Sequence, residues 1–155
     1  MKWISAAVVC AAVALAACTQ TPATPADPAA IVEERNAAFM AAVAAGDGAS
    51  VGANYAEDAV LMPPGAPAVE GRDAIGQFWQ GGIDAGVARI ELAPGEAIAA
   101  NADTILERST ARLFNAAGDM IEQGKYVVIW RQVDGQWYIA WDIWNGDAPA
   151  AAPAQ

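Results

Sequence analysis

Two acidic residues are the side chains of this sequence best suited to acid–base chemistry. Asp142 and Glu107 each lie within an apolar, β-rich run, where we expect them to share an interior with Lys125 and Ser109. A carboxylate withdrawn from water has a raised pKa and can act as a general acid or base near neutrality. Asp142 and Glu107 are therefore the catalytic candidates. The alternative is structural, with Lys125 neutralising Asp142 and with Glu107 or Ser109 completing a hydrogen-bond network.

The absence of histidine limits the chemistry that the chain can perform. The sequence has no His and only two Cys, Cys10 and Cys18. Histidine is the usual general base at neutral pH and the commonest metal ligand. Nucleophile systems that pair Ser or Cys with His are therefore excluded. Two carboxylates beside a lysine make a poor metal site, so we predict neither a metal nor a cofactor.

The first residues have the pattern of an export signal. Lys2 precedes an apolar run, 4–14, which is shorter than the roughly 20 residues of a membrane-spanning helix. The run ends in Leu-Ala-Ala-Cys, which resembles the bacterial lipobox, with an ordinary signal peptide as the alternative. We predict a lipoprotein signal peptide at 1–17 and a lipidated Cys18. Thr19 after the cysteine favours the outer membrane, facing the periplasm.

Composition divides the rest of the chain into a tether, one domain and a tail. Residues 18–28 are rich in Pro, Thr and Ala and are predicted to be a flexible tether, and 147–155 a disordered tail. The domain is then 29–146. The formal net charge of −10 repels nucleic acid and anionic lipid, so we predict no nucleic-acid partner and membrane contact only through the lipid anchor.

Helices come first in the domain and hairpin-linked strands follow. This order predicts an α+β fold with an antiparallel sheet. The expected helices begin at Asp27-Pro28, at Ala49 and at Arg72. The expected strands are 59–62, 87–99, 104–114 and the two arms of a final hairpin, 124–145.

The final hairpin turns at Asp134-Gly135, a strong signal for a tight primed turn. Regular pairing from this turn places Val127 opposite Asp142 and Lys125 opposite Trp144. The opposite face then carries an apolar stripe too large to expose on a monomer. We predict a homodimer through this stripe, with contact to another protein as the alternative. The stripe consists of Tyr126, Trp130, Trp137 and Trp141.

Several short motifs resemble the nuclear-transport-factor-2-like superfamily. They are Gly46-Asp47, Tyr55–Val60 with Pro63-Pro64-Gly65, Gly71–Ile75 with Phe78-Trp79, and Asp142–Asn145. The last of these, with Lys125-Tyr126, is most similar to the SnoaL-like and ketosteroid-isomerase-like domains of unknown function. The resemblance implies a cystatin-like cone, in which three N-terminal helices pack on a strongly curved antiparallel sheet around a pocket. It also implies that the domain often forms homodimers.

The same resemblance argues against the best-known activity of the superfamily. Its steroid isomerases use a tyrosine, an acidic residue deep in the sheet and an aspartate base after the first strand. Alignment of the motifs places the tyrosine on Phe39, the aspartate base on Pro63 and the buried acidic residue on Val127. None of these side chains can donate or accept the required proton.

We therefore predict a pocket that binds a small apolar or cyclic ligand without turning it over. Two alternatives stay open, namely an isomerase, dehydratase or cyclase that uses Asp142 or Glu107, and a dimerising protein-interaction module. The aromatic members of the pocket could equally be core packing. The predicted pocket residues are Phe39, Tyr55, Met62, Phe78, Trp79, Glu107, Ser109, Lys125, Val127, Asp142 and Trp144.

Overall fold

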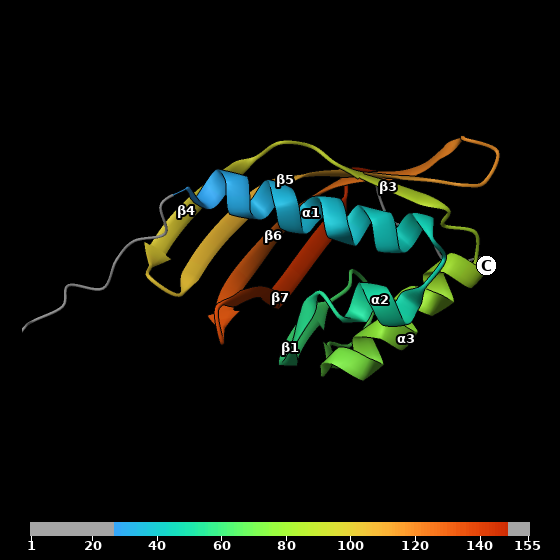
Figure 1. The fold of residues 1–155 in the computed structure, drawn as a ribbon. Coiled ribbons are helices and arrows are strands. Elements are labelled where there is room, and N and C mark those ends of the chain that lie inside the picture. Colours follow the sequence, from blue (N-terminus) through green and yellow to red (C-terminus); the bar gives the residue numbers. More distant parts are fainter. Residues whose placement is uncertain (1–26, 149–155) are drawn as a thin grey trace, which may run out of the picture.

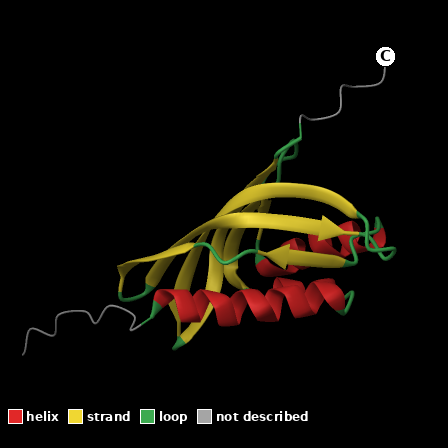
Figure 2. Ribbon diagram, turned by 90° about the horizontal axis from the view of Figure 1, so that it is seen from above, coloured by secondary structure: helices red, strands yellow, loops and turns green. Residues whose placement is uncertain are grey.

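The computed structural model describes residues 27–148, which form three helices packed on a curved sheet (Figures 1 and 2). The predicted signal peptide, Cys18, nearly all of the tether and most of the tail lie outside the described residues. The helices are α1 (Pro28–Ala44), α2 (Gly48–Gly52) and α3 (Arg72–Asp84). The strands are β1 (Tyr55–Met62), β2 (Val69–Glu70), β3 (Arg89–Leu92), β4 (Glu96–Asn101), β5 (Thr104–Phe114), β6 (Met120–Val133) and β7 (Gln136–Gly146).

The first two helices begin at capping aspartates. Asp27 accepts a hydrogen bond from the Ala30 amide at 3.1 Å, ahead of Pro28 in the first turn of α1. Asp47 caps α2 in the same way through the Ser50 amide at 3.0 Å. The start predicted for the first helix is confirmed. Figure 1 shows α1 lying along the sheet, and this helix buries Val32, Asn36, Phe39, Ala42 and Val43.

Helices α2 and α3 cross at glycines that allow their backbones to touch. A Cβ added to Gly48 would lie 2.6 Å from the Gly76 carbonyl oxygen, and one added to Gly52 would lie 2.9 Å from that of Arg72. These separations leave no room for a side chain. The close crossing fixes the position of α3, which carries Phe78 and Trp79.

The sheet has the strand order β2-β1-β7-β6-β5-β3, and β4 also pairs with β5. The helices cover one face of it (Figure 2). The sheet is mixed and not wholly antiparallel as expected, because β1 runs parallel to β7. Parallel neighbours need a long crossover connection, and the chain between β1 and β7 supplies one. The strand predicted at 87–99 is two strands, β3 and β4, separated by Ala93-Pro94-Gly95.

A bulge in β7 determines which residues face the helices. The turn at Asp134 (φ 51°) and Gly135 (φ 81°) is confirmed, as is the pairing of Val133 with Gln136. Beyond Ile139 the register shifts by one residue, because Ala140 is the extra residue of a bulge. Asp142 therefore pairs with Val128, and Trp144 with Tyr126. The predicted pairings with Val127 and Lys125 are wrong.

The one-residue shift reverses the predicted faces of β6. Tyr126 (7% exposed), Trp130 (0%) and Trp137 (8%) are buried in the core and do not form an outer stripe. Of the four stripe residues, only Trp141 lies on the outer face, where it is 55% exposed. Lys125 and Val127 are on the outer face as well. Side chains alternate across a strand, so a register error of one residue inverts every assignment derived from it.

Candidate functional site

A cavity of about 220 Å³ lies between α1, α3 and the inner face of the sheet. Its aromatic lining is Phe39, Phe78, Trp79, Tyr126 and Trp144, and its aliphatic lining includes Val87, Ile90, Leu92, Leu113, Val128 and Ile139. The polar side chains in the lining are Asn36, Glu122 and Asp142. A mostly apolar cavity with a few convergent polar groups is the usual form of a small-molecule site.

Asp142 presents one carboxylate oxygen that has no hydrogen-bond donor. The side chain is 7% exposed, and its Oδ2 accepts a hydrogen bond from the Tyr55 hydroxyl at 2.7 Å. The Tyr55 oxygen in turn accepts from the Trp79 indole nitrogen at 3.1 Å. No hydrogen bond among residues 27–148 reaches Oδ1 of Asp142. The residue lines the cavity, so Oδ1 is available to a ligand.

The surroundings of Asp142 favour its neutral form. Burial raises the pKa of Asp142 from 3.8 to about 6, the Tyr55 hydrogen bond offsets part of this rise, and the charge of Glu107 adds to it. Burial, followed by the charge of Asp142, raises the pKa of Tyr55 well above its ordinary value. Tyr55 therefore remains a hydrogen-bond donor, while Asp142 changes its charge close to physiological pH.

Unlike Asp142, Glu107 accepts hydrogen bonds at both of its carboxylate oxygens. Its Oε1 accepts from Asn36 Nδ2 at 2.7 Å and from the Tyr126 hydroxyl at 2.5 Å, and its Oε2 accepts from Trp130 Nε1 at 2.8 Å. Glu107 is 1% exposed and is absent from the cavity lining. Its three donors join α1 to β6. This is a buried structural network of the predicted kind, made by different partners.

The partners predicted for the two acids lie elsewhere. Lys125 pairs with Asp147 at 2.7 Å near the end of β7, and Ser109 donates to the Ala93 carbonyl oxygen at 2.6 Å. The described residues form four ion pairs, all between exposed or half-exposed side chains, and none includes Asp142 or Glu107. The prediction that Lys125 neutralises Asp142 is therefore wrong, because Lys125 lies on the outer face.

Four aromatic rings form a contiguous cluster at the cavity. Trp79 and Trp144 stack with centroids 6.1 Å apart, and Phe39 contacts Trp79 edge-on at 5.2 Å. Phe78 lies 6.3 Å from Trp79 and 6.1 Å from Trp144. All four line the cavity together with Asp142, and Tyr55 reaches the cavity wall through its hydrogen bond to Asp142. Tyr55, Met62, Ser109, Lys125 and Val127 were predicted in the pocket and, like Glu107, do not line it.

Sequence reasoning missed Asn36 as a site residue. It lies between Val32, Phe39 and Val43 on the buried face of α1, and it is 9% exposed. A polar residue at helical spacing among apolar ones is a detectable signal, since a buried amide needs a partner. Glu107, its partner, lies 71 residues further along the chain. Tyr126 also lines the cavity, although it was predicted to be in the outer stripe.

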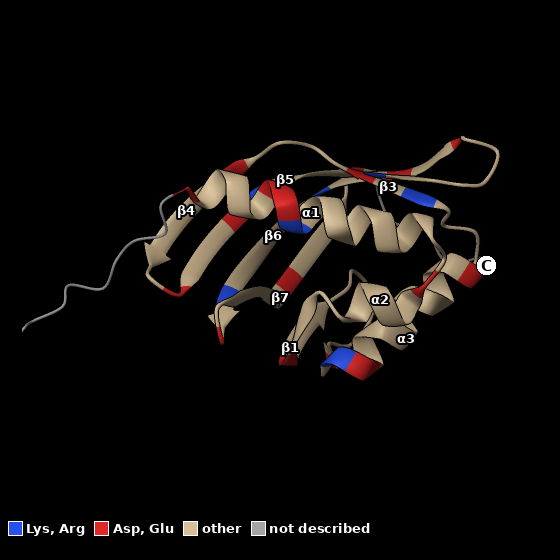
Figure 3. Cartoon of the chain, in the orientation of Figure 1, with Lys and Arg blue, Asp and Glu red and all other residues tan. Residues whose placement is uncertain are grey.

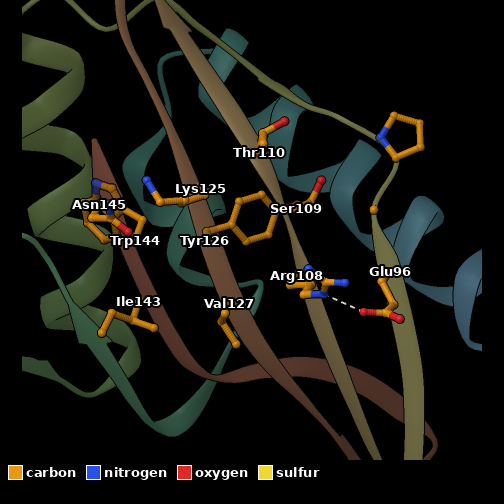
Figure 4. A pocket seen from close by; sticks show the side chains of 12 residues that line it. Glu96, Arg108, Ser109, Thr110, Lys125, Tyr126, Val127, Ile143, Trp144 and Asn145 are labelled. Carbon is orange, nitrogen blue, oxygen red and sulfur yellow. Dashed lines mark hydrogen bonds and ion pairs between the residues drawn. The ribbon is translucent and has the colours of Figure 1, made fainter. Parts of the chain in front are cut away.

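A second hollow, of about 680 Å³, lies on the outer face of the sheet. Figure 4 shows Val127 and Ile143 on neighbouring strands in its wall, with Lys125 close by. Val127 is thus separated by the sheet from the interior cavity. On the inner face of β6, Tyr126 and Val128 flank Val127. Neither of these is an acid.

Residues 27–148 contain few Lys and Arg side chains, and these are scattered over separate elements (Figure 3). Within residues 27–148, no group of three or more His, Cys, Asp or Glu side chains is positioned to hold a metal ion. No helix in that same range is long and apolar enough to cross a membrane.

Comparisons with known proteins agree with this fold. Among solved structures, the chain resembles a Mycobacterium tuberculosis protein of unknown function (21% identity, TM-score 0.69, covering 78% of this chain and 72% of that one). It also resembles a ketosteroid isomerase-like protein from Erwinia carotovora atroseptica (25% identity, TM-score 0.65, covering 81% of this chain and 100% of that one). A third similar structure is a nuclear-transport-factor-2-like protein with a cystatin-like fold from Novosphingobium aromaticivorans (17% identity, TM-score 0.69, covering 79% of this chain and 84% of that one).

A search of curated proteins finds no match. The family model of the SnoaL-like domain matches residues 36–139, which include α1 from the buried Asn36 onward and run into β7. This match covers more than half of the chain, and the predicted superfamily and cone-shaped α+β fold are confirmed. The chain belongs to the family of SnoaL-like domains.

Proposed function

We propose that this protein binds a small, mostly apolar ring compound in the interior cavity. The observation that carries the proposal is the unoccupied Oδ1 of Asp142 in the wall of an otherwise apolar cavity. A ligand in the cavity can donate a hydrogen bond to this oxygen, and a hydrogen bond to a charged group contributes about 1.5–3 kcal/mol. The apolar walls would supply affinity through the hydrophobic effect.

The cavity volume limits the size of the ligand. Drug-sized ligands occupy pockets of about 300–1,000 Å³, whereas a cavity of about 150 Å³ holds benzene. The cavity here measures about 220 Å³. A compound with one substituted ring fits this volume, and a steroid exceeds it.

Two neighbouring glycines of α3 allow a matched test. Gly82 lines the cavity and Gly81 does not, and a Cβ at either position has open space around it. Gly82→Leu should place its side chain at the cavity and reduce ligand binding at least tenfold. Gly81→Leu should leave binding unchanged. Both changes should stabilise the helix by roughly 0.5–1 kcal/mol, since Leu is a better helix former than Gly.

Binding is measured by thermal shift and calorimetry with a library of single-ring compounds. Ligands that bind the native state raise the melting temperature by mass action. We expect hits whose shifts disappear in Gly82→Leu and persist in Gly81→Leu. No hit across the library, or hits equally affected by both variants, would refute the cavity as the binding site.

A second candidate function is acid–base catalysis by Asp142, as an isomerase, dehydratase or cyclase. The observation that favours it is the pKa of about 6 together with the free oxygen at the cavity. Glu107 is less suited to this role because three donors hold its carboxylate away from the cavity. If turnover of a bound ring compound is found, Asp142→Asn should abolish it and leave binding measurable. Undiminished turnover would exclude Asp142 as the acid or base.

We also propose that a second copy of the chain covers the outer face of the sheet. Leu106, Ile129 and Trp141 form one row across three strands, and Val127 lies beside Ile143 in the next. Leu106, Val127, Trp141 and Ile143 are 40%, 44%, 55% and 46% exposed. Such a contiguous apolar surface is typical of a protein interface. A symmetric dimer would pair these rows with themselves, as in most homodimers.

A further inference from the structure

The interior cavity combines buried negative charge with an aromatic wall. Asp142 is 7% exposed and Glu107 is 1% exposed, and Asp142 lines the cavity together with a third acid, Glu122. The charges of Asp142 and Glu107 interact, since Glu107 contributes to the raised pKa of Asp142. No Lys or Arg is in the cavity lining.

None of these three acids forms an ion pair with a Lys or Arg within residues 27–148. The four ion pairs of this region involve Glu91, Glu96, Asp147 and Asp58, all of which are at the surface. A buried carboxylate without a counter-ion costs several kcal/mol or shifts to its neutral form. A ligand that brings a positive charge would remove this cost, whereas an anionic ligand would increase it.

The aromatic cluster favours the same charge. Phe39, Phe78, Trp79 and Trp144 all line the cavity, with neighbouring centroids between 5.2 and 6.3 Å apart. The faces of aromatic rings carry negative potential and attract ammonium groups within about 6 Å of the centroid. Tryptophan is the strongest of these rings, and two tryptophans are present.

We propose that the ligand is a protonated amine attached to a small apolar ring, with its ammonium group donating to Oδ1 of Asp142. This inference rests on the proposed function and names its ligand class. The hydrogen-bonded chain from Trp79 through Tyr55 holds Oδ2 of Asp142, so the carboxylate is already oriented before the ligand arrives. A pre-oriented acceptor reduces the entropy lost on binding.

Three probes of nearly equal size and different charge test the proposal, namely benzylamine, benzyl alcohol and benzoate. Their affinities are measured by calorimetry at pH 7.5 on the full chain, where benzylamine is protonated. Both benzylamine and benzyl alcohol can donate to Oδ1, but only benzylamine adds the attraction between opposite charges in a site shielded from water, so it should bind about tenfold or more tightly than benzyl alcohol. Benzoate should bind most weakly of the three.

The variant Asp142→Asn should reduce the preference for benzylamine over benzyl alcohol to about threefold or less. Asp103→Asn, at an exposed turn residue, serves as the matched control and should keep the wild-type preference. Equal binding of benzylamine and benzyl alcohol to the wild type would overturn this inference and support only the apolar cavity. A preference that survives Asp142→Asn would overturn the role of Asp142. No binding of any probe would refute the proposed function, and this inference with it.

Discussion

Replacing Asp142 with asparagine should stabilise the protein at neutral and alkaline pH. The pKa of this carboxyl is raised from 3.8 to about 6 in the folded state, mainly by burial. Below about pH 3.8 the group is protonated in both the folded and the unfolded states, and it makes no contribution to the pH dependence. Between these two values the unfolded state loses its proton first, so the free energy of unfolding falls as pH rises. Above about pH 6 the folded state bears the full free-energy cost of keeping this buried carboxyl ionised.

The size of this cost follows from the difference between the two pKa values. At about 1.4 kcal/mol per pKa unit, it is about 3 kcal/mol. Asparagine removes the charge but retains an oxygen that can accept from the Tyr55 hydroxyl. A hydrogen bond to a neutral acceptor is weaker than one to a carboxylate by about 1 kcal/mol. The net gain at pH 8 is therefore about 2 kcal/mol.

Urea unfolding of the wild type and Asp142→Asn at pH 5 and pH 8 measures this effect. The advantage of the variant should grow by about 1.4 kcal/mol between the two pH values, because about half of the cost is already present at pH 5. Surface carboxylates remote from Asp142 titrate equally in both proteins and cancel in the comparison. Asp103→Asn, an exposed control, should change the free energy of unfolding by less than about 0.5 kcal/mol at either pH. A variant that is destabilised equally at both pH values would refute the reasoning.

Four further predictions concern other parts of the molecule. Tyr55→Phe leaves Asp142 Oδ2 and the Trp79 indole N–H without their partner, so urea unfolding should show a loss of about 2 kcal/mol or more; a loss below about 0.5 kcal/mol would contradict the chain of hydrogen bonds. Gly48→Ala should lower the melting temperature, because its Cβ would lie 2.6 Å from the Gly76 carbonyl oxygen, and an unchanged value would contradict the close crossing. Trp141→Glu should convert the proposed dimer to a monomer in light scattering, and a persisting dimer would exclude this outer face as the interface. Cys18→Ser should release the protein from bacterial membranes if the predicted lipid anchor is correct, and membrane retention would contradict it.

Local signals in the sequence predicted the elements well. Asp27-Pro28 marks the start of α1, where Asp27 is the N-cap, and the helix expected from Ala49 begins at Gly48 after its N-cap Asp47. Asp134-Gly135 forms the predicted turn, and β5 has the predicted bounds of Thr104 and Phe114. Each of these features depends on the backbone preferences of a few neighbouring residues, which the local sequence reveals.

The faces of the final hairpin could not be predicted in the same way. The bulge falls at Ala140, a residue with no special preference for positive φ or for turns, so nothing in the sequence marks it. Without the bulge, Asp142 pairs with Val127, and the exposed face of β6 is mistaken for the buried one. The Glu107 network was also out of reach, because it joins α1 to β5 and β6 across long stretches of chain. Predicting the residue types was possible, whereas predicting their partners required the register.

The glycine crossing of α2 and α3 determines which wall of the cavity can adapt to ligands of different size. Gly48 and Gly76 bring the two backbones together, so Phe78 and Trp79 project from a helix that cannot retreat without separating them. The opposite wall contains Leu92, at the end of β3, where strand pairing with β5 is interrupted before Glu96. An interrupted edge deforms at lower cost than close-packed backbone. Selection for larger ligands should therefore alter the β3–β4 edge and leave the helical wall unchanged.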